Sequence, residues 1–203
     1  MNYLSFRNQF INQDLISTQQ MVRMFPDFDS RRLVEWQKKG YIERVVNRWY
    51  RFLEIPQEEN SLFWTSNRIY QPSYISLESA LSFHGLIPEG VYAITAISTL
   101  KTHTYQNNSI NYIYRNVKPS LYFGYQILRW KDKPILMASP EKALLDFCYL
   151  NSHLKTREDF ESLRINPSIF ISKIDLKVLE NYLQLFDNQA LNKKIKILRE
   201  IYA

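Results

Sequence analysis

The chain has 203 residues, of which 45% are hydrophobic and 15% aromatic, so it suits one large or two small folded domains and excludes a disordered chain or a disulfide-stapled mini-protein. A single cysteine excludes an internal disulfide, and one cysteine with three scattered histidines excludes a zinc finger. We therefore expect a reduced, cytoplasmic protein without metal or cofactor. The 26 Lys and Arg residues against 20 Asp and Glu residues give a net charge of +6, which favours an anionic partner.

Three short helices are predicted at the amino end of the chain. They cover Tyr3–Phe10, a segment that ends at Phe25, and Ser30–Lys39. Ser17 or Thr18 offers a cap for the second helix, which Pro26 stops. Asp29 offers an N-cap oxygen for the third helix, and Gly40 ends it because glycine readily takes the left-handed conformation.

An alternating pattern of apolar and polar residues then predicts a β-hairpin. Its strands are Tyr41–Val46 and Trp49–Phe52, joined by Asn47 and Arg48. Asn47 tolerates the left-handed backbone region that such a turn needs. The first 56 residues therefore predict one small unit of helices followed by a hairpin.

Most of the net charge is concentrated between residues 31 and 51. This stretch has a local excess of five positive charges, because only Glu35 and Glu43 oppose seven basic residues. The seven are Arg31, Arg32, Lys38, Lys39, Arg44, Arg48 and Arg51. On a helical wheel the basic residues of the third helix fall with Glu35 within an arc of roughly 120°, and Leu33, Val34 and Trp36 occupy the rest.

A basic helix that follows a tight turn and precedes a basic hairpin is typical of a winged helix-turn-helix, in which the helix enters the major groove of DNA. Arg31 and Arg32 lie in the first turn of that helix, so we expect them to contact base edges. The other five are expected at phosphates: Lys38, Lys39, Arg44, Arg48 and Arg51. The alternative is that these charges only solvate the outside of a small module.

Residues 57–73 are predicted to be a linker or a linking helix, and residues 74–203 a second domain. Helices are predicted over Leu77–His84, Pro140–Leu150, Arg157–Leu163, Leu176–Phe186 and Gln189–Tyr202. Strands are predicted over Val91–Ile97, Ile110–Arg115, Leu121–Arg129 and Ile135–Ala138. The expected fold class is α+β: a winged helix-turn-helix over residues 1–56, then a domain with a small antiparallel sheet and several helices.

Two runs in the second domain carry a resemblance to a known family. Tyr74–Pro88 has the sequence YISLESALSFHGLIP, and Ala138–Asp146 has the sequence ASPEKALLD. Together they resemble the AbiEi-type antitoxins of bacterial abortive-infection systems, over nearly the whole chain. The resemblance implies an N-terminal winged helix-turn-helix that represses its own operon and a C-terminal domain that helps to neutralise a nucleotidyltransferase-like toxin. The family commonly has glycine in an Arg-Gly-x-Tyr turn, where this chain has Asn47-Arg48-Trp49-Tyr50.

Five residues of the second domain allow an enzymatic interpretation. Glu78, His84, Glu141, Lys142 and Asp146 are types that can share a proton. Helix capping and i, i+4 pairing explain these residues more simply than catalysis does. No nucleophile motif, phosphate loop or metal-ligand spacing accompanies them. We therefore expect a protein that is not an enzyme.

The leading hypothesis is a transcriptional autorepressor and antitoxin that binds repeated half-sites in its own promoter, with a toxin from the same operon as its functional partner. The rival is a protein-interaction module that sequesters the toxin without specific DNA binding. The C-terminal helix leaves two interpretations open, a partner contact or a packed helix with a solvated basic face. Its basic residues are Lys193, Lys194, Lys196 and Arg199.

Overall fold

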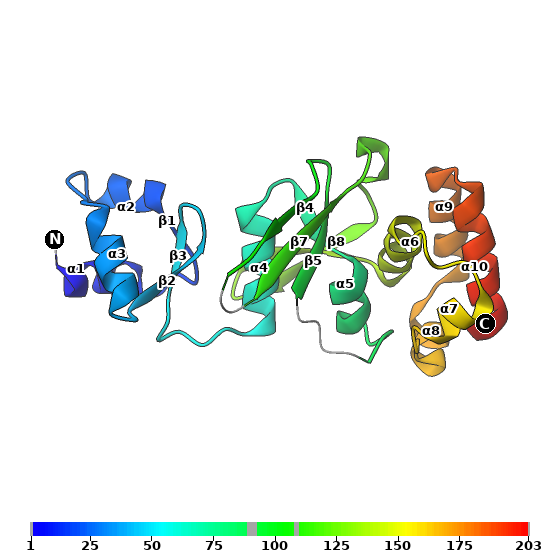
Figure 1. Cartoon of the computed structure of the whole chain (residues 1–203). Helices are drawn as coiled ribbons and strands as arrows, with labels where there is room; N and C mark the ends of the chain where they lie inside the picture. The colour runs from blue at the N-terminus through cyan, green and yellow to red at the C-terminus, as the bar shows by residue number, and fades with distance from the viewer. Residues whose placement is uncertain (1, 89–92, 108–109, 203) are drawn as a thin grey trace.

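The computed structural model describes residues 2–88, 93–107 and 110–202, and shows a mixed α and β protein with two sheets (Figure 1). A smaller unit at the amino end contains three helices and a three-stranded antiparallel sheet in the order β1-β3-β2. Its elements are α1 (Tyr3–Phe10), β1 (Ile16–Ser17), α2 (Thr18–Met24), α3 (Arg31–Lys38), β2 (Ile42–Val46) and β3 (Trp49–Phe52).

Local hydrogen bonds explain where the first helices begin. The Asn2 side chain accepts the backbone N–H of Ser5, which caps α1. Ser17 and Gln20 form a reciprocal capping box at the start of α2. The predicted helices and hairpin are present with nearly the predicted bounds. The strand β1 was not predicted, because two residues are too few to show an alternating pattern.

The left-handed residue of the β2–β3 turn is Arg48, with φ 68°, and not Asn47 as the sequence suggested. A register shift between Arg44 and Val46 accompanies this turn. The turn is fixed in place because the N–H of Thr18, at the start of α2, donates a 2.9 Å hydrogen bond to the Arg48 carbonyl. The tip of the hairpin therefore adjoins the first residue of α2.

The larger unit contains a six-stranded sheet in the order β6-β7-β5-β4-β9-β8. Its strands are β4 (Ser73–Ile75), β5 (Ala93–Ser98), β6 (His103–Tyr105), β7 (Asn111–Asn116), β8 (Tyr125–Trp130) and β9 (Lys133–Ala138). The expected antiparallel sheet was wrong, because β5 pairs with β7 and β4 pairs with β9 in parallel. Strand periodicity does not show which strands become neighbours. The first two residues of the strand predicted from Val91 lie outside the described residues.

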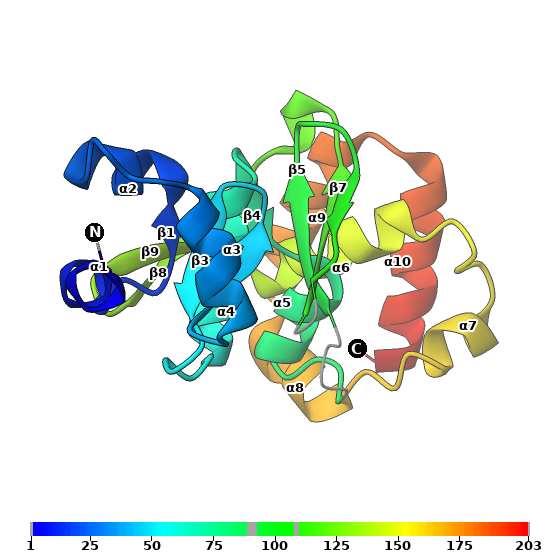
Figure 2. The same ribbon diagram turned by 60° about the vertical axis from the view of Figure 1, so that its left-hand side comes forward.

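Helices of the larger unit lie on both sides of this sheet and at its far end. They are α4 (Glu59–Ile69), α5 (Leu77–Phe83), a 3-10 turn (Pro119–Leu121), α6 (Pro140–Leu150), α7 (Arg157–Glu161), α8 (Pro167–Lys173), α9 (Leu176–Phe186) and α10 (Gln189–Tyr202). The stretch 57–73, expected as a linker or a linking helix, contains α4, whose Phe63 is buried in the larger core. The helices α7 to α10 lie at the end of the molecule opposite α1 (Figures 1 and 2). Among the described residues, no helix combines the length and the apolar composition that crossing a bilayer requires.

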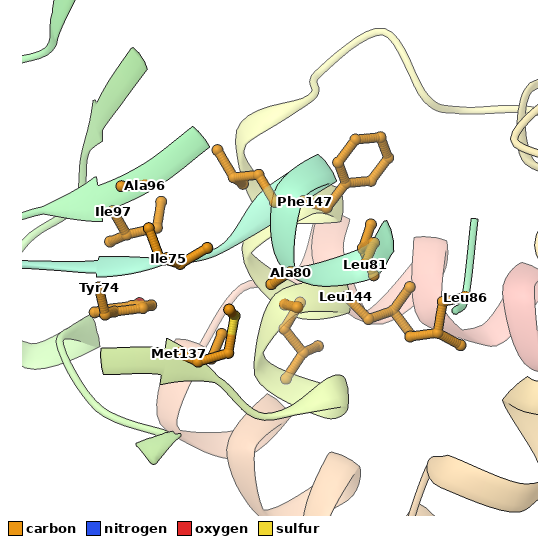
Figure 3. Close-up of a cluster of buried hydrophobic side chains, with 14 of the residues drawn as sticks. Tyr74, Ile75, Ala80, Leu81, Leu86, Ala96, Ile97, Met137, Leu144 and Phe147 are labelled. Atoms are coloured by element: carbon orange, nitrogen blue, oxygen red, sulfur yellow. The ribbon is translucent and has the colours of Figure 1, made fainter. Parts of the chain in front are cut away.

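The two motif runs meet in the centre of the larger core. The first continues from β4 into α5, and the second continues from β9 into α6. Because β4 and β9 are parallel neighbours, both helices start at the same edge of the sheet, and Figure 3 shows Ile75, Ala80, Met137 and Leu144 gathered there. Ser139 caps α6 by accepting the N–H of Lys142, and Pro140 is at its first turn, as predicted.

The small sheet packs against helices on one face and against the larger unit on the other. Ile42 and Phe52 belong to the smaller core, while Val45 and Val46 belong to the larger one. An ion pair between Lys133 and Asp14 joins the two units as well. The hairpin is thus held between the two hydrophobic cores, and this placement decides which of its side chains can reach a ligand.

Candidate nucleic-acid interface

Helix α3 presents a polar face to solvent because its apolar residues anchor the opposite face. Leu33 and Trp36 are buried in the smaller core, where the Trp36 ring lies 4.7 Å from that of Phe6, centroid to centroid. Val34 was grouped with them in the sequence, but it is 54% exposed. The exposed face of α3 therefore combines basic side chains with one aliphatic side chain, a set that suits contact with both phosphates and base edges.

The first turn of α3 carries the two arginines predicted to contact bases. The Arg31 side chain is 90% exposed and forms an ion pair with Asp29 at 2.9 Å. Asp29 also accepts the backbone N–H of Arg31 at 3.0 Å, so the predicted capping oxygen is present although Ser30 is the N-cap residue. These hydrogen bonds lower the pKa of Asp29 and raise that of Arg31. Arg32 is half-buried and lies within the electrostatic reach of Asp29 and Glu35.

The last turn of α3 carries two exposed lysines with different surroundings. Lys39 donates a 2.6 Å hydrogen bond to Glu35, one turn earlier on the helix. Lys38 is exposed and makes no ion pair or hydrogen bond through its side chain within the part of the chain that the structure describes. An anion can therefore bind Lys38 without breaking an ion pair within the described residues, whereas at Lys39 it would compete with Glu35.

The hairpin turn adds a further exposed cation beside α2. Arg48 is exposed, and a shallow hollow between the turn and α2 is lined by Thr18, Arg23, Arg48 and Trp49 among others. Sequence reasoning missed Arg23 because it lies outside the dense basic stretch, and only the pairing of β1 with β3 brings α2 to the hairpin tip. Arg23 and Arg48 share one concave surface.

Arg51, predicted to contact phosphate, is held by partners within the protein. Its side chain is 12% exposed, pairs with Glu43 on the neighbouring strand, and donates to the carbonyl of Ile55 at 2.9 Å. The reason is strand alternation: Arg51 lies between the core residues Tyr50 and Phe52, so its side chain points to the face of β3 that packs on the larger unit. Its guanidinium holds the end of the hairpin and is not free for DNA.

Arg44 takes an intermediate position. It is exposed, but it lines a groove between β2 and the β6–β7 region together with Gln37, Gln106 and Asn107. The Asn107 amide donates to the carbonyl of Val45 across this groove at 3.4 Å. A polyanion can reach Arg44 only from the open side of the groove, so we place it at the margin of the candidate interface.

Four of the five residues that allow an enzymatic interpretation are held by contacts within the fold. Lys142 and Asp146 make an ion pair with both side chains fully buried, and Glu141 accepts the N–H of Asp175 at 2.9 Å. Nε2 of His84 lies 2.8 Å from the Ala138 carbonyl oxygen. The predicted i, i+4 pairing of Lys142 and Asp146 is thus present, whereas the His84 ring contacts a carbonyl of β9 and not one at the end of its own helix. Among the described residues, no group of three or more His, Cys, Asp or Glu side chains could hold a metal ion.

Asp146 is the centre of this buried cluster. It accepts hydrogen bonds from the hydroxyls of Tyr74 at 2.9 Å and Ser76 at 2.8 Å in addition to the Lys142 ammonium group. Burial raises the pKa of Asp146 and lowers that of Lys142, while their mutual attraction opposes both changes. The cluster connects the two motif runs of the sequence, since Tyr74 and Ser76 come from the first run and Lys142 and Asp146 from the second.

No protein-family model matches the chain, and no curated protein matches its sequence.

Proposed function

We propose that this protein is a DNA-binding transcriptional autorepressor, and that its amino-terminal unit is a winged helix-turn-helix. The observation that carries the proposal is the exposed face of α3, on which Arg31 and Lys38 are both exposed, followed in the chain by a hairpin whose turn carries the exposed Arg48. In this proposal α3 lies in the major groove and the hairpin follows the backbone. The resemblance of the two motif runs to AbiEi-type antitoxins further supports an autorepressor of a toxin–antitoxin operon.

The proposed contacts divide according to the surroundings of each side chain. Arg31 and Arg32 contact base edges from the first turn of α3, and binding exchanges the exposed pair between Arg31 and Asp29 for contacts to DNA. Lys38 and Arg48 contact phosphates, because neither side chain has a protein partner within the described residues. Arg23 extends the phosphate contacts from α2, a position that sequence reasoning did not include.

The proposal is tested by binding the full chain to the DNA upstream of its own gene. A fragment of this promoter should be bound more tightly than a scrambled fragment of equal length in an electrophoretic mobility shift assay. The apparent affinity should fall as salt rises, with a log–log slope of about −0.9 for each phosphate neutralised. Equal affinity for both fragments, or an affinity that does not change with salt, would contradict the proposal.

A second candidate function is a protein-interaction module that binds a toxin without specific DNA recognition. It is favoured by large apolar side chains exposed on the helices at the far end of the molecule, with Ile171 69% and Leu185 58% exposed. Mixing the protein with the product of the neighbouring gene separates the two candidates. A stable complex in size-exclusion chromatography, combined with no preference for promoter DNA, would favour this second candidate.

A further inference from the structure

A cavity in the larger unit shares no lining residue with the hollow between α2 and the hairpin turn. It is open to solvent and bordered by α4, by the connection from α4 to β4, and by the turn between β8 and β9. Its volume of about 640 Å³ falls within the range of small-molecule sites, roughly 300–1,000 Å³. The residues used in the argument are Trp64, Arg68, Ser73, Tyr122, Asp132 and Lys133.

One of the residues that line the cavity, Ser73, carries a buried hydroxyl without a partner. Ser73 is 3% exposed, and its Oγ makes no hydrogen bond within the described part of the chain. The nearby Asn67 amide cannot supply one readily, because its Oδ1 accepts the N–H of Leu136 at 2.8 Å and its Nδ2 donates to the Ser73 carbonyl at 3.3 Å. A buried hydroxyl without a partner costs free energy unless water or a ligand completes it.

Around this hydroxyl the cavity offers aromatic surface and charge. The ring of Trp64 and the ring of Tyr122 line it, and the Lys133 ammonium group lies 4.6 Å from the Trp64 ring centroid. Lys133 is already neutralised by Asp14, whereas Arg68 is exposed and has no carboxylate partner among the described residues. A guanidinium that no carboxylate neutralises is suited to a phosphate group, and the neighbouring aromatic rings suit a planar ligand.

Asp132 adds a negatively charged hydrogen-bond acceptor to the site. It is exposed at the β8–β9 turn, with φ 60°, and no ion pair holds it within the described ranges. A carboxylate accepts hydrogen bonds from ring or exocyclic N–H groups, such as those on the edge of a nucleobase. The cavity thus combines an anion-binding group, an acceptor for N–H donors, a buried hydroxyl and aromatic walls.

We propose that this cavity is a binding site for a mononucleotide. The base lies against the aromatic walls, the phosphate pairs with Arg68, and the Ser73 hydroxyl gains the hydrogen bond that it lacks in the free protein. The proposal goes beyond the proposed function and does not depend on it. It does connect the site to the smaller unit, because Arg68 lies over the Trp49 ring, 5.8 Å from its centroid, and Lys133 pairs with Asp14.

The test is calorimetric titration of the full chain with each of the four ribonucleoside 5′-monophosphates, with the matching nucleosides and inorganic phosphate titrated separately. At least one monophosphate should bind at one site per chain. Its nucleoside and inorganic phosphate should each bind at least about tenfold more weakly, because each provides only half of the contacts.

Two variants and one control locate the binding. Arg68→Gln should weaken nucleotide binding by about tenfold or more, and Ser73→Ala by roughly three- to tenfold. Arg129→Gln changes an exposed arginine of β8 that does not line the cavity, so it should bind as the unmodified protein does. Circular dichroism of each variant confirms that the fold is retained.

Three results would overturn the proposal. The first is no saturable binding of any of the four monophosphates at millimolar concentration. The second is a nucleotide that binds no more tightly than inorganic phosphate, which would reduce the cavity to a simple anion site. The third is nucleotide binding that Arg68→Gln and Ser73→Ala both leave unchanged. None of these results depends on whether the protein binds promoter DNA.

Discussion

The smaller and the larger units use basic residues in opposite ways. On α3 the Arg31 guanidinium is almost fully exposed, and its ion pair with Asp29 lies in water. In α6 the Lys142 ammonium group is fully buried and faces Asp146 and the rings of Phe123 and Phe186 at 4.9 Å. An exposed pair contributes little to stability and is easily exchanged for another anion, whereas a buried pair cannot lose one partner without leaving an uncompensated charge.

This difference separates residues that maintain the fold from residues that are free to bind. Arg51 shows that position in the sequence is not the criterion, since it lies in the basic stretch and is nevertheless buried against Glu43. Lys194, in the basic C-terminal helix, similarly donates to the carbonyls of Cys148 and Asn151. A basic residue is a candidate for ligand contact only where the tertiary structure leaves its charge exposed and without a strong internal partner.

The largest expected effect breaks the buried pair of the larger unit. Asp146→Asn leaves Lys142 buried without its counter-ion and should lower the free energy of unfolding by about 3–5 kcal/mol. Urea denaturation followed by circular dichroism measures this. Glu161→Gln, which removes one partner of the exposed i, i+4 pair with Arg157, is the matched control and should leave the urea midpoint nearly unchanged.

The double variant Lys142→Met with Asp146→Leu should recover part of the lost stability, because it removes both buried charges together but leaves the Tyr74 and Ser76 hydroxyls without their acceptor. Equal losses from Asp146→Asn and Glu161→Gln would show that burial does not distinguish the two kinds of pair.

The next effect concerns sequence recognition by α3. Replacing both Arg31 and Arg32 by alanine should weaken promoter binding by about 10- to 100-fold, since a bidentate arginine–guanine contact contributes roughly 1–3 kcal/mol. Binding to random DNA should change much less. Fluorescence anisotropy with both DNAs measures the difference. The control replaces Lys118 and Arg129, two exposed basic residues of the larger unit, by alanine. Equal losses on both DNAs would argue against contact with bases.

A smaller effect is expected from replacing the basic side chains proposed to contact DNA phosphates. Lys38→Ala or Arg48→Ala should weaken binding to promoter and random DNA alike and should reduce the magnitude of the log–log salt slope by about 0.9 each. Arg51→Met should leave this slope unchanged, because its guanidinium is held within the protein. Anisotropy titrations at several salt concentrations give the slopes. A reduced slope for Arg51→Met would restore Arg51 to the DNA-contact set.

The smallest effect is a pH dependence from the larger unit. Burial lowers the pKa of His84 below its usual value of 6.5, so between these two pKa values the unfolded chain binds a proton that the folded chain does not. The stability that His84 contributes is complete above about pH 6.5 and is lost as the pH falls toward the folded pKa. Urea midpoints at several pH values should show this loss, and His84→Asn should remove part of it. The exposed His153→Asn is the control, and an equal change from both variants would contradict the assignment to His84.

Local sequence signals predicted much of the secondary structure. Proline at Pro26 and Pro140, the capping serines Ser17 and Ser139, and the left-handed Gly40 act within a few residues, so helix ends follow from neighbours in the chain. The sheet of the larger unit was not predictable in this way. Its order depends on contacts between distant segments, and the three-residue strands β4 and β6 are too short to show a period.

The sequence by itself determined that a basic helix and hairpin follow two helices near the amino end, and that Lys142 and Asp146 lie one helical turn apart, because these features depend on local spacing. Only the tertiary structure decided which charges stay in water. The second face of the small sheet packs on the larger unit and buries Arg51, while the pairing of β1 with β3 brings Arg23 beside Arg48. The free energy of a charge depends on the solvent and dipoles around it, and those surroundings form only when distant segments pack together.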